Sequence, residues 1–494
     1  MKARDLINSI GSYTSSSPFE DFPVRGVSCN SGEVQDGFIF VAIRGTHEDG
    51  HKFIDEAIRK GAKAVVVQGS GFPSTSLGTG RVQGSGKISF IIVEDTRQAL
   101  AKLAAEFSGR PSRKIKVIGV TGTNGKTTVT YLIEAILQEA GFSPGVIGTV
   151  NYRFKDKIIP SKNTTPGPVE IQSLLADMAR DGLEYALMEV SSHALDQERI
   201  GEIAFHSAIF TNLTQDHLDY HHNLENYFQA KTKLFKNLLP ESFAIVNNDD
   251  AYADRLKGLT RAKVITYGIE RNCDISAENI RSDIAHSEFS VLGRKDLAMT
   301  SHLIGRHNIY NMLASIAWAL SEGIKPEIIK SAIQKFSLVP GRMEQITCPG
   351  FYIFVDYAHT EDALNNALRT LRPFSQGRLI VVFGCGGERD KTKRPKMGYT
   401  VTELADYAVI TNDNPRSEDP QEIINDIKKG IQKENFCVIP ERLQAIKESL
   451  AMAHSGDIVL IAGKGHEDYQ ILNNRREHFD DREAVRECLK SMKF

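Results

Sequence analysis

Short apolar segments alternate with amphipathic ones along most of the chain. An apolar run of roughly four to eight residues favours a buried strand, and a longer run with a 3.6-residue period favours a helix. On this basis residues 114–120 are predicted to form a strand and residues 129–140 a helix. A second helix is predicted at 53–60, and further strands at 37–43, 62–67, 185–190, 207–212, 242–247, 351–357, 378–383, 405–411, 436–439 and 457–462.

The regularity of this alternation divides the chain into three regions. A chain of 494 residues exceeds the roughly 250–300 at which a single core stops growing, so several domains are expected. We predict a small N-terminal α/β domain at 1–110, a central domain with a P-loop-type, mostly parallel sheet at 111–339, and a C-terminal Rossmann-like α/β domain at 340–494. The Gly/Ser/Thr-rich stretch 69–87 is predicted to be a surface loop, with phosphate or sugar binding as the alternative.

Composition narrows the classes of function. Apolar residues make up 41% and charged residues 25% of the chain, which is ordinary for a soluble globular protein. A net charge of −2 provides no basic field for nucleic acid, and no apolar run approaches the ~20 residues that membrane insertion needs. The N-terminus lacks the apolar region of a signal peptide, and the six cysteines show no C-x-x-C spacing. We expect a cytoplasmic monomer with free thiols.

The most informative segment is the glycine-rich turn TGTNGKTT at 121–128, between the predicted strand and helix. Backbone N–H groups at the start of a helix favour phosphate, a lysine adds charge, and a threonine hydroxyl suits Mg²⁺. The standard phosphate loop has glycine six positions before the lysine, where this chain has Val120. A chance glycine turn is the alternative, but the pattern favours a subgroup of ATP-binding enzymes. The predicted nucleotide-binding residues are Gly122, Thr123, Asn124, Gly125, Lys126, Thr127 and Thr128.

Two further strand ends carry polar side chains. Glu189 ends the strand predicted at 185–190, where a carboxylate can reach Mg²⁺ beside a phosphate loop or simply cap the strand. The segment 211–222 contains His217 and His221 at i, i+4. Zinc binding is conceivable for that pair, but no cysteine or HExxH pattern accompanies it, so metal binding beside ATP is the more economical interpretation.

Six motifs occur in a fixed order along the chain: TGTNGKTT, MEVSSH, NLTQDHLDYH, GRHNIYN, PGRME and DYAHT. With them, over essentially its whole length, the chain resembles the Mur ligases, the ATP-dependent amide-forming enzymes that build the cell-wall peptide on a UDP-sugar. The motifs NTTP at 163–166, GCGGERD at 384–390 and DNPR at 413–416 favour the branch of that family that adds the third residue to UDP-N-acetylmuramoyl-L-alanyl-D-glutamate.

The resemblance implies a reaction and its catalytic residues. ATP phosphorylates a substrate carboxylate, an amine attacks the acyl phosphate, and phosphate leaves, so catalysis consists largely of positioning and charge neutralisation. By resemblance Lys126, Thr127, Glu189 and His217 bind phosphate and Mg²⁺. Lys231 matches a lysine that the family carries as a carbamate, which supplies negative oxygens where an ammonium would repel the metal. The alternative for Lys231 is a solvated helix lysine.

The remaining ligand contacts are also implied by resemblance. Adenine and ribose contacts fall on Asn308, Arg342 and Asp356, with Tyr357 and His359 nearby. One departure from relatives is Asn30-Ser31-Gly32, where they usually have Asp-Ser-Arg, which puts the uridine contacts in doubt. The UDP-sugar dipeptide is expected at Ser31, Thr46, His47, Glu48, Asn163, Thr164, Thr165, Ser191, Gln197 and Arg199, and the added amino acid at Arg389, Asp413, Asn414, Pro415, Arg416, Gly463 and Glu467.

The identity of the added amino acid depends on one charge. Lysine and meso-diaminopimelate differ by a distal carboxylate, which an arginine binds bidentately. By resemblance Arg416 is that cation, Arg389 is a second one and Glu467 receives the ammonium. We therefore expect an ATP-dependent ligase that adds meso-diaminopimelate. The alternatives are the same reaction with L-lysine, a folylpolyglutamate-synthetase-like ligase, and a non-catalytic nucleotide-binding module.

Overall fold

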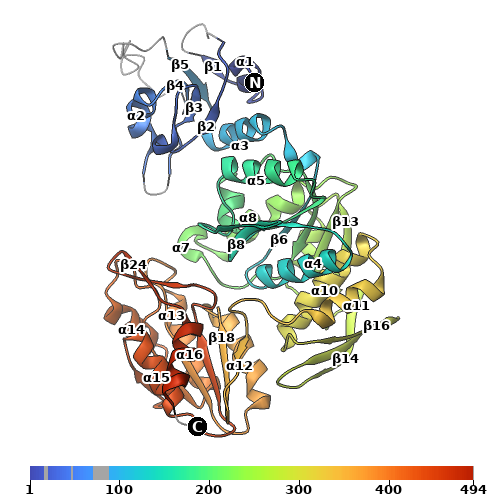
Figure 1. The fold of residues 1–494 in the computed structure, drawn as a ribbon, viewed down its shortest axis with the longest axis vertical. Helices are drawn as coiled ribbons and strands as arrows, with labels where there is room; N and C mark the ends of the chain where they lie inside the picture. The colour runs from blue at the N-terminus through green and yellow to red at the C-terminus, as the bar shows by residue number, and fades with distance from the viewer. Residues whose placement is uncertain (16–20, 46–47, 70–87, 493–494) are drawn as a thin grey trace.

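Three α/β units follow one another along the long axis of the molecule (Figure 1). The computed structural model describes residues 1–15, 21–45, 48–69 and 88–492. Within these residues each unit has its own sheet and its own buried clusters, and a separate two-stranded hairpin lies near the C-terminus. The predicted three-domain α/β architecture is confirmed.

The first unit contains, in the described part of the chain, a five-stranded sheet. Its order is β1-β5-β4-β3-β2, and β1 is antiparallel to β5 while the other pairs are parallel. The strands and helix predicted at 37–43, 62–67 and 53–60 are confirmed, whereas residues 70–87 of the predicted loop lie outside the described residues. The elements are α1 (Ala3–Asn8), β1 (Thr14–Ser15), β2 (Gly26–Ser28), η1 (Ser31–Glu33), β3 (Phe38–Val41), η2 (Gly50–Phe53), α2 (Ile54–Arg59), β4 (Ala62–Gln68), β5 (Ser89–Val93), α3 (Thr96–Phe107) and η3 (Pro111–Arg113).

The central unit is built on an eleven-stranded sheet, counted over the described residues. Its order is β16-β15-β14-β13-β12-β11-β6-β10-β7-β8-β9. The middle strands are parallel, and antiparallel strands extend both edges, β7-β8-β9 on one side and β14-β15-β16 on the other. The strands are β6 (Lys116–Thr121), β7 (Gly145–Ile147), β8 (Asn151–Phe154), β9 (Lys157–Pro160), β10 (Tyr185–Glu189), β11 (Phe205–Phe210), β12 (Phe243–Asn247), β13 (Lys263–Gly268), β14 (Ile275–Ser282), β15 (Ser287–Val291) and β16 (Arg294–Ser301).

Helices cover both faces of this central sheet. One face buries the apolar sides of α4, α10 and α11, and the other buries those of α5 and α8. Because both faces are covered by helices, β6 and β10 are buried on both sides, and their sequences are continuous apolar runs. The helices are α4 (Lys126–Glu139), α5 (Pro168–Arg180), α6 (Ser192–Asp196), α7 (Leu218–His221), α8 (Leu224–Lys236), α9 (Ala253–Lys257), α10 (Arg306–Ser321) and α11 (Pro326–Lys335).

The third unit is Rossmann-like. Its sheet, as described, has the order β17-β18-β22-β19-β20-β21, with β17 antiparallel at one edge and the other strands parallel. The elements are β17 (Glu344–Ile346), β18 (Tyr352–Asp356), α12 (Glu361–Leu371), η4 (Arg372–Phe374), β19 (Leu379–Phe383), α13 (Lys393–Leu404), β20 (Tyr407–Ile410), α14 (Pro420–Lys428), β21 (Phe436–Val438), α15 (Arg442–Ala451), β22 (Ile458–Ala462), β23 (Tyr469–Leu472), β24 (Arg475–His478) and α16 (Asp481–Ser491).

The structure also shows the state of the cysteines and the character of the helices. All six cysteines are free, as predicted. No helix in the described ranges is both long enough and apolar enough to cross a membrane.

A buried ion pair fastens the outer helices of the third unit to its sheet. Arg442 at the start of α15 binds Asp481 at the start of α16 through two hydrogen bonds of 2.7 Å, and both side chains are fully buried. Arg442 also donates to the carbonyl of Ala462 at 3.0 Å, at the end of β22. The pair therefore supports the chain just before Gly463, a predicted substrate residue.

We predict that Asp481→Ala destabilises the third unit by roughly 3–5 kcal/mol, because it leaves the Arg442 guanidinium buried without its carboxylate. Scanning calorimetry of the full chain measures the effect as a lower melting temperature. Asp296→Ala is the matched control, since its 3.0 Å pair with Arg294 is exposed to solvent and contributes little to stability. Equal melting temperatures for the two variants would contradict the prediction.

Candidate functional site

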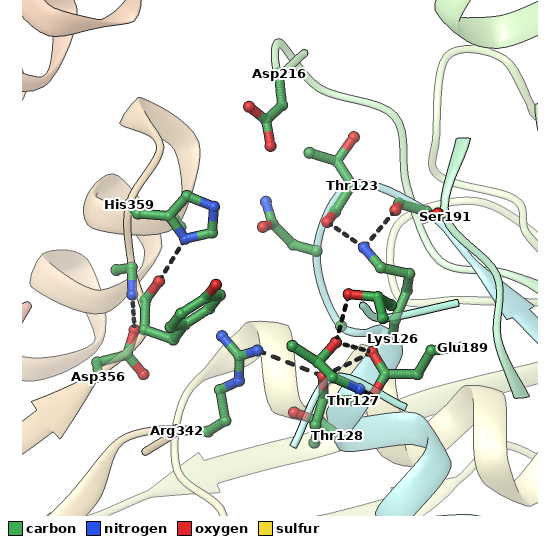
Figure 2. Close-up of a pocket in the computed structure, with 18 of the residues that line it drawn as sticks. Thr123, Lys126, Thr127, Thr128, Glu189, Ser191, Asp216, Arg342, Asp356 and His359 are labelled. Carbon is green, nitrogen blue, oxygen red and sulfur yellow. Dashed lines mark hydrogen bonds between the residues drawn. The ribbon is translucent and has the colours of Figure 1, made fainter. Parts of the chain in front are cut away.

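The carboxyl ends of the central and C-terminal sheets line one cavity of about 850 Å³. The loops after β6, β10 and β11 form one wall, and those after β18, β20 and β22 form the other. In open α/β sheets ligands bind outside the carboxyl ends of the strands. Here two such edges meet, and Figure 2 shows the side chains of both walls pointing towards a common space.

The phosphate loop between β6 and α4 is held in shape by close backbone packing. Gly125 has φ +88°, and a Cβ there would lie 2.4 Å from Asn311 Oδ1. A Cβ on Gly122 would lie 1.9 Å from the hydroxyl of Thr211. Both glycines are therefore required by space as well as by conformation. The Lys126 ammonium donates to the carbonyls of Gly122 and Thr123, each at 2.9 Å.

Glu189 lies directly opposite this loop in a tight cradle. Its carboxylate accepts hydrogen bonds from the Thr127 hydroxyl at 2.9 Å, the Thr149 hydroxyl at 2.8 Å and the Thr149 N–H at 2.9 Å. A Cβ on Gly148 would lie 2.5 Å from Glu189 Oε1, so the turn after β7 fits closely around the acid. Glu189 is 1% exposed, and its contacts with Thr127 are visible in Figure 2.

The donors at this position fit a magnesium site. A hydroxyl and a carboxylate are hard oxygen ligands, and Mg²⁺ in nucleotide sites uses one or two such protein groups together with phosphate oxygens and water. Among the described residues, no group of three or more His, Cys, Asp or Glu side chains is placed to hold a metal ion. Of the two histidines in the zinc alternative, His221 has its Nε2 2.9 Å from the Ser192 hydroxyl.

A buried charge network continues from the loop towards the second wall. His217 Nε2 lies 3.4 Å from Asp216 Oδ2, and Lys393 Nζ lies 3.7 Å from Asp216 Oδ1. Burial alone would raise the pKa of Asp216, but His217, Lys393 and His359 outweigh burial and hold it below its ordinary value. Burial lowers the pKa of His217 to about 3, so His217 is neutral and able to bind a metal at neutral pH.

Lys231 lies beneath the phosphate loop. It is 2% exposed, donates to the Gly122 carbonyl at 3.0 Å, and its Nζ lies 4.5 Å from the centre of the Tyr227 ring. Burial and then the nearby Lys126 charge lower the pKa of Lys231 well below its ordinary value. The solvated-lysine alternative is therefore wrong for Lys231.

The C-terminal unit contacts the phosphate loop directly. Arg342 Nη2 lies 3.4 Å from the Thr127 hydroxyl, and Asn124 Nδ2 donates to Asp362 Oδ2 at 2.8 Å. Asp356 accepts from the Met343 and Ala358 N–H groups at 2.7 and 2.8 Å. Figure 2 shows Arg342 between Thr127 on one side and Asp356 and His359 on the other.

The amino-acid candidates cluster around the partly buried carboxylate of Glu467. Glu467 accepts from Asn414 Nδ2 at 2.8 Å and from the Tyr357 hydroxyl at 3.2 Å, and its Oε2 lies 3.5 Å from Lys464 Nζ. Burial and the neighbouring Asp413 raise the pKa of Glu467.

Arg416 lies in the same wall of the cavity. It has φ +59°, its backbone N–H donates to the Ile471 carbonyl of the β23–β24 hairpin at 3.1 Å, and its Nη1 donates to the carbonyls of Gly387 and Asn414. Both guanidinium contacts use Nη1, whereas Nη2 and Nε are further donors of the same group. Arg389 is exposed and also lines the cavity.

The structure gathers most, but not all, of the predicted residues at this cavity. Ser31 lies in the first unit, where its hydroxyl donates to Glu56 at 2.7 Å, and Arg199 is tied to Gln197 and to the Thr165 carbonyl. Thr46 and His47 lie outside the described residues. Not lining the cavity are Ser31, Glu48, Thr165, Gln197, Arg199 and Pro415. Lining it are Gly122, Thr123, Asn124, Gly125, Lys126, Thr127, Thr128, Asn163, Thr164, Glu189, Ser191, His217, Lys231, Asn308, Arg342, Asp356, Arg389, Asp413, Asn414, Arg416, Gly463 and Glu467.

Many residues of the cavity were not predicted from the sequence, and three of them contact residues of the sequence motifs. Thr149 follows a short strand and matches no motif, although two of its groups hold Glu189. Lys393 stands in a run of basic residues that resembles a solvated face, yet it is only 6% exposed. Asp362 lies near the DYAHT motif, but only the folded structure brings it to Asn124.

Comparison with known proteins gives a consistent picture over the whole chain. Three family models match: Mur ligase family, catalytic domain, at residues 23–108; Mur ligase middle domain, at 120–319; and Mur ligase, glutamate ligase domain, at 341–465. The UDP-N-acetylmuramoyl-L-alanyl-D-glutamate–2,6-diaminopimelate ligase of Clostridium tetani is 44% identical over 477 residues, covering 96% of each chain. The protein of the same name from Aquifex aeolicus is 45% identical over 468 residues, covering 94% of each.

Solved structures agree with these relatives. A structure of a UDP-N-acetylmuramoyl-L-alanyl-D-glutamate–2,6-diaminopimelate ligase has a TM-score of 0.66 at 32% identity, covering 98% of both chains. The MurF ligase of Thermotoga maritima in complex with ADP has a TM-score of 0.64 at 21% identity, covering 94% of this chain and 97% of that one. A folylpolyglutamate synthase of Mycobacterium tuberculosis reaches 0.61 at 16% identity and covers 74% of this chain and 92% of that one. The last two similarities show the fold alone.

One partly buried histidine of the cavity should make the free energy of unfolding depend on pH. Burial lowers the pKa of His307 to about 4, and its Nδ1 is buried with no hydrogen-bond partner among the described residues. In the unfolded chain this histidine is protonated below about pH 6.5, whereas in the folded chain it stays neutral down to about pH 4. The free energy of unfolding therefore falls as the pH drops through this window.

The free energy of unfolding, measured by urea titration, should fall less between pH 7 and pH 5 in His307→Asn than in the wild type. We predict a difference of about 1–2 kcal/mol in that loss. Equal losses in the variant and the wild type would refute the assignment.

Proposed function

The chain belongs to the Mur ligase family, and we propose that it joins meso-diaminopimelate to the D-glutamate carboxylate of UDP-N-acetylmuramoyl-L-alanyl-D-glutamate at the expense of ATP. One observation carries the proposal. A phosphate loop with its lysine and an arginine–glutamate wall suited to a diamino acid line the same cavity. The relatives from Clostridium tetani and Aquifex aeolicus, which carry the name of this ligase, support it.

The chemistry requires the carboxylate to be activated before an amine can attack it. Transfer of the γ-phosphoryl group of ATP to a carboxylate oxygen gives an acyl phosphate, whose carbonyl carbon accepts the amine. The resulting tetrahedral intermediate then expels inorganic phosphate and leaves the amide. Each step moves negative charge between oxygens, so fixed cations and N–H donors that surround these oxygens lower the barriers.

The chain supplies these donors from both walls. Lys126 and the N–H groups at the start of α4 face the phosphates, and Arg342 approaches them from the C-terminal unit. Thr127 and Glu189, with His217 and a carbamylated Lys231, would hold Mg²⁺, which neutralises phosphate charge when bound. Asn308 and Asp356 line the adenosine end of the cavity in this proposal.

The state of Lys231 follows from the charges around it. Its amine and that of Lys126 both donate to the Gly122 carbonyl, at 3.0 and 2.9 Å, so two potential ammonium groups share one acceptor in a buried place. An uncharged amine can form an N–C bond to CO₂ and release one proton to solvent, so the carbamate that results is an anion. The addition therefore replaces repulsion between two cations with attraction between Lys126 and a negative group.

The diamino acid would lie between Glu467 and Arg416. Glu467 is the anion for an ammonium group, and the guanidinium of Arg416 is the cation for the distal carboxylate that lysine lacks. Arg389, at the rim of the same wall, is available for the second carboxylate. Lysine would leave Arg416 without an anion, which favours meso-diaminopimelate over L-lysine. The similarity to folylpolyglutamate synthase, at 16% identity, concerns the fold only.

The remaining proposals concern the UDP-sugar and the setting of the reaction. We assign residues 1–110 to UDP-sugar binding, 111–339 to ATP and ligation, and 340–494 to the amino acid. Asn163, Thr164 and Ser191 line the cavity, so the peptide end of the substrate would enter there, with Thr165, Gln197 and Arg199 behind them. The proposed setting is the cytoplasm, as a monomer.

Phosphate release tests the proposed function. We expect release from ATP only when the UDP-dipeptide and a suitable amino acid are both present, with meso-diaminopimelate far ahead of L-lysine and glutamate. A protein that prefers lysine would contradict the specificity, and one that binds ATP without releasing phosphate would be a nucleotide-binding module.

Arg416→Ala tests the selectivity. We predict a roughly 10–100-fold loss of kcat/KM for meso-diaminopimelate, because a charged hydrogen-bonded pair is worth about 1.5–3 kcal/mol, while the KM for ATP stays within about twofold. Arg475→Ala is the control, since Arg475 is exposed on the neighbouring β24. A uniform loss for all amino acids would point to a folding defect.

Carbamylation of Lys231 can be detected directly. With ¹³C-labelled bicarbonate, we expect a carbamate ¹³C NMR signal in the wild type and in Lys233→Gln, whose lysine is partly exposed and pairs with Glu198 at 2.9 Å. Lys231→Gln should lose both the signal and the activity. A fully active, metal-bound wild type without the signal would rule out the carbamate.

A further inference from the structure

Tyr357, immediately after β18, lies between the two halves of the cavity. The Arg342 guanidinium carbon is 4.3 Å from the centre of the Tyr357 ring, and Nη2 of the same guanidinium is 3.4 Å from the Thr127 hydroxyl of the phosphate loop. The Tyr357 hydroxyl donates to Glu467 Oε1 at 3.2 Å. One side chain thus contacts the arginine that faces the phosphate loop and the carboxylate of the amino-acid wall.

The two contacts use different parts of the tyrosine. Arg342 lies over the ring, where the negative face of the π-system attracts a cation. Glu467 is bound by the hydroxyl, and burial raises the pKa of Tyr357 well above its ordinary value, so the hydroxyl keeps the proton that it donates. Because the contacts do not compete, both can exist at once and each can be removed separately.

The backbone around Tyr357 is packed without spare room. A Cβ on Gly341 would lie 2.1 Å from the backbone N of His466, and a Cβ on Gly465 would lie 2.7 Å from the Cβ of Tyr357. The His466 ring centre is 5.0 Å from that of Tyr357. The segment that carries Arg342, the tyrosine and the loop that carries Glu467 therefore pack directly against one another.

Glu467 depends on its hydrogen-bond donors for its orientation. Asn414 holds Oε2 at 2.8 Å, whereas the Tyr357 hydroxyl binds the other oxygen, Oε1. Without the Tyr357 hydroxyl, the Glu467 carboxylate can rotate about its hydrogen bond to Asn414. A rotated carboxylate no longer points at a fixed position for the ammonium of the incoming amino acid.

We propose that Tyr357 is a positioning residue that couples nucleotide binding to amino-acid binding. A bound nucleotide fixes Arg342, Arg342 fixes the ring of Tyr357, and the hydroxyl then holds Glu467 in the orientation that receives the ammonium. By linkage, a bound amino acid tightens nucleotide binding by the same factor. This inference rests on the proposed function for the assignment of the two ligands to the two walls, and it adds a mechanism by which the amine site is completed only when ATP is present.

The coupling is measured with the full chain, a non-hydrolysable ATP analogue and saturating UDP-dipeptide, so that no turnover occurs. Calorimetry gives the dissociation constant of the analogue with and without meso-diaminopimelate. We expect the amino acid to tighten binding of the analogue at least about fivefold in the wild type. In Tyr357→Phe, which keeps the ring and loses the hydroxyl, we expect this factor to fall to near one, while affinity for the analogue alone changes less than about twofold.

Two further variants complete the test. Tyr357→Leu also removes the ring, so the analogue alone should bind several-fold more weakly. Tyr352→Phe is the matched control, because it deletes the hydroxyl of an exposed tyrosine at the other end of β18. In this variant meso-diaminopimelate should tighten binding of the analogue as much as in the wild type. In turnover, Tyr357→Phe should raise the KM for meso-diaminopimelate roughly tenfold with kcat reduced less, as expected for a lost hydrogen bond to a charged group.

Two results would overturn the proposal. In one, meso-diaminopimelate does not tighten binding of the ATP analogue to the wild type. In the other, it tightens binding to Tyr357→Phe as much as to the wild type, so that the packed backbone and not the hydroxyl carries the coupling. Failure of the proposed function is a separate result, seen as the absence of phosphate release by the wild type with meso-diaminopimelate. If another amino acid supports release, the same comparison is made with that amino acid. Only the behaviour of the Tyr357 variants then decides the coupling.

Discussion

The carbonyl oxygen of Gly122 accepts hydrogen bonds from two lysines, the buried Lys231 and the partly buried Lys126, and much of the site can be understood from the charge that gathers there. Lys126 approaches at 2.9 Å and Lys231 at 3.0 Å. Burying two ammonium groups side by side is costly unless anions accompany them or one loses its proton. Phosphate groups would neutralise Lys126, and a carbamate would turn Lys231 from a competing cation into an anion. The neighbouring Asp216 and Glu189 supply further negative charge.

The second sheet turns this phosphate site into a site for two substrates. Asp362 reaches Asn124, Lys393 reaches Asp216, and Arg342 reaches Thr127, so each contact joins the C-terminal unit to a loop at the carboxyl edge of the central sheet. An acyl phosphate is hydrolysed by water, so the amine must be held close to it in a shielded space. A cavity formed where two sheet edges face each other provides that arrangement, with the amine and the phosphate on opposite walls.

The parts of the fold and of the site that carry local signals could be predicted from the sequence. The strand β6, its glycine turn and α4 are contiguous, so the pattern alone placed Lys126 and Thr127 at the junction of turn and helix, where the structure has them. The outlying strands β14 and β16 were not predicted because their exposed faces carry charged residues such as Glu278 and Lys295. Lys393 was missed because a basic run looks solvated until the fold brings Asp216 to it. The resemblance to a family supplied Arg416 and Glu467, which no local spacing connects. Ser31 remains a prediction, and in this structure its hydroxyl is bonded to Glu56.

Isotope transfer tests the formation of an acyl phosphate in this cavity most directly. The D-glutamate carboxylate of the UDP-dipeptide is labelled with ¹⁸O, and the phosphate released during ligation of meso-diaminopimelate is analysed by mass spectrometry. If a carboxylate oxygen attacks the γ-phosphorus and leaves with phosphate when the amine displaces it, the released phosphate carries ¹⁸O in proportion to the amide formed. Unlabelled phosphate accompanying full amide formation would contradict the mechanism.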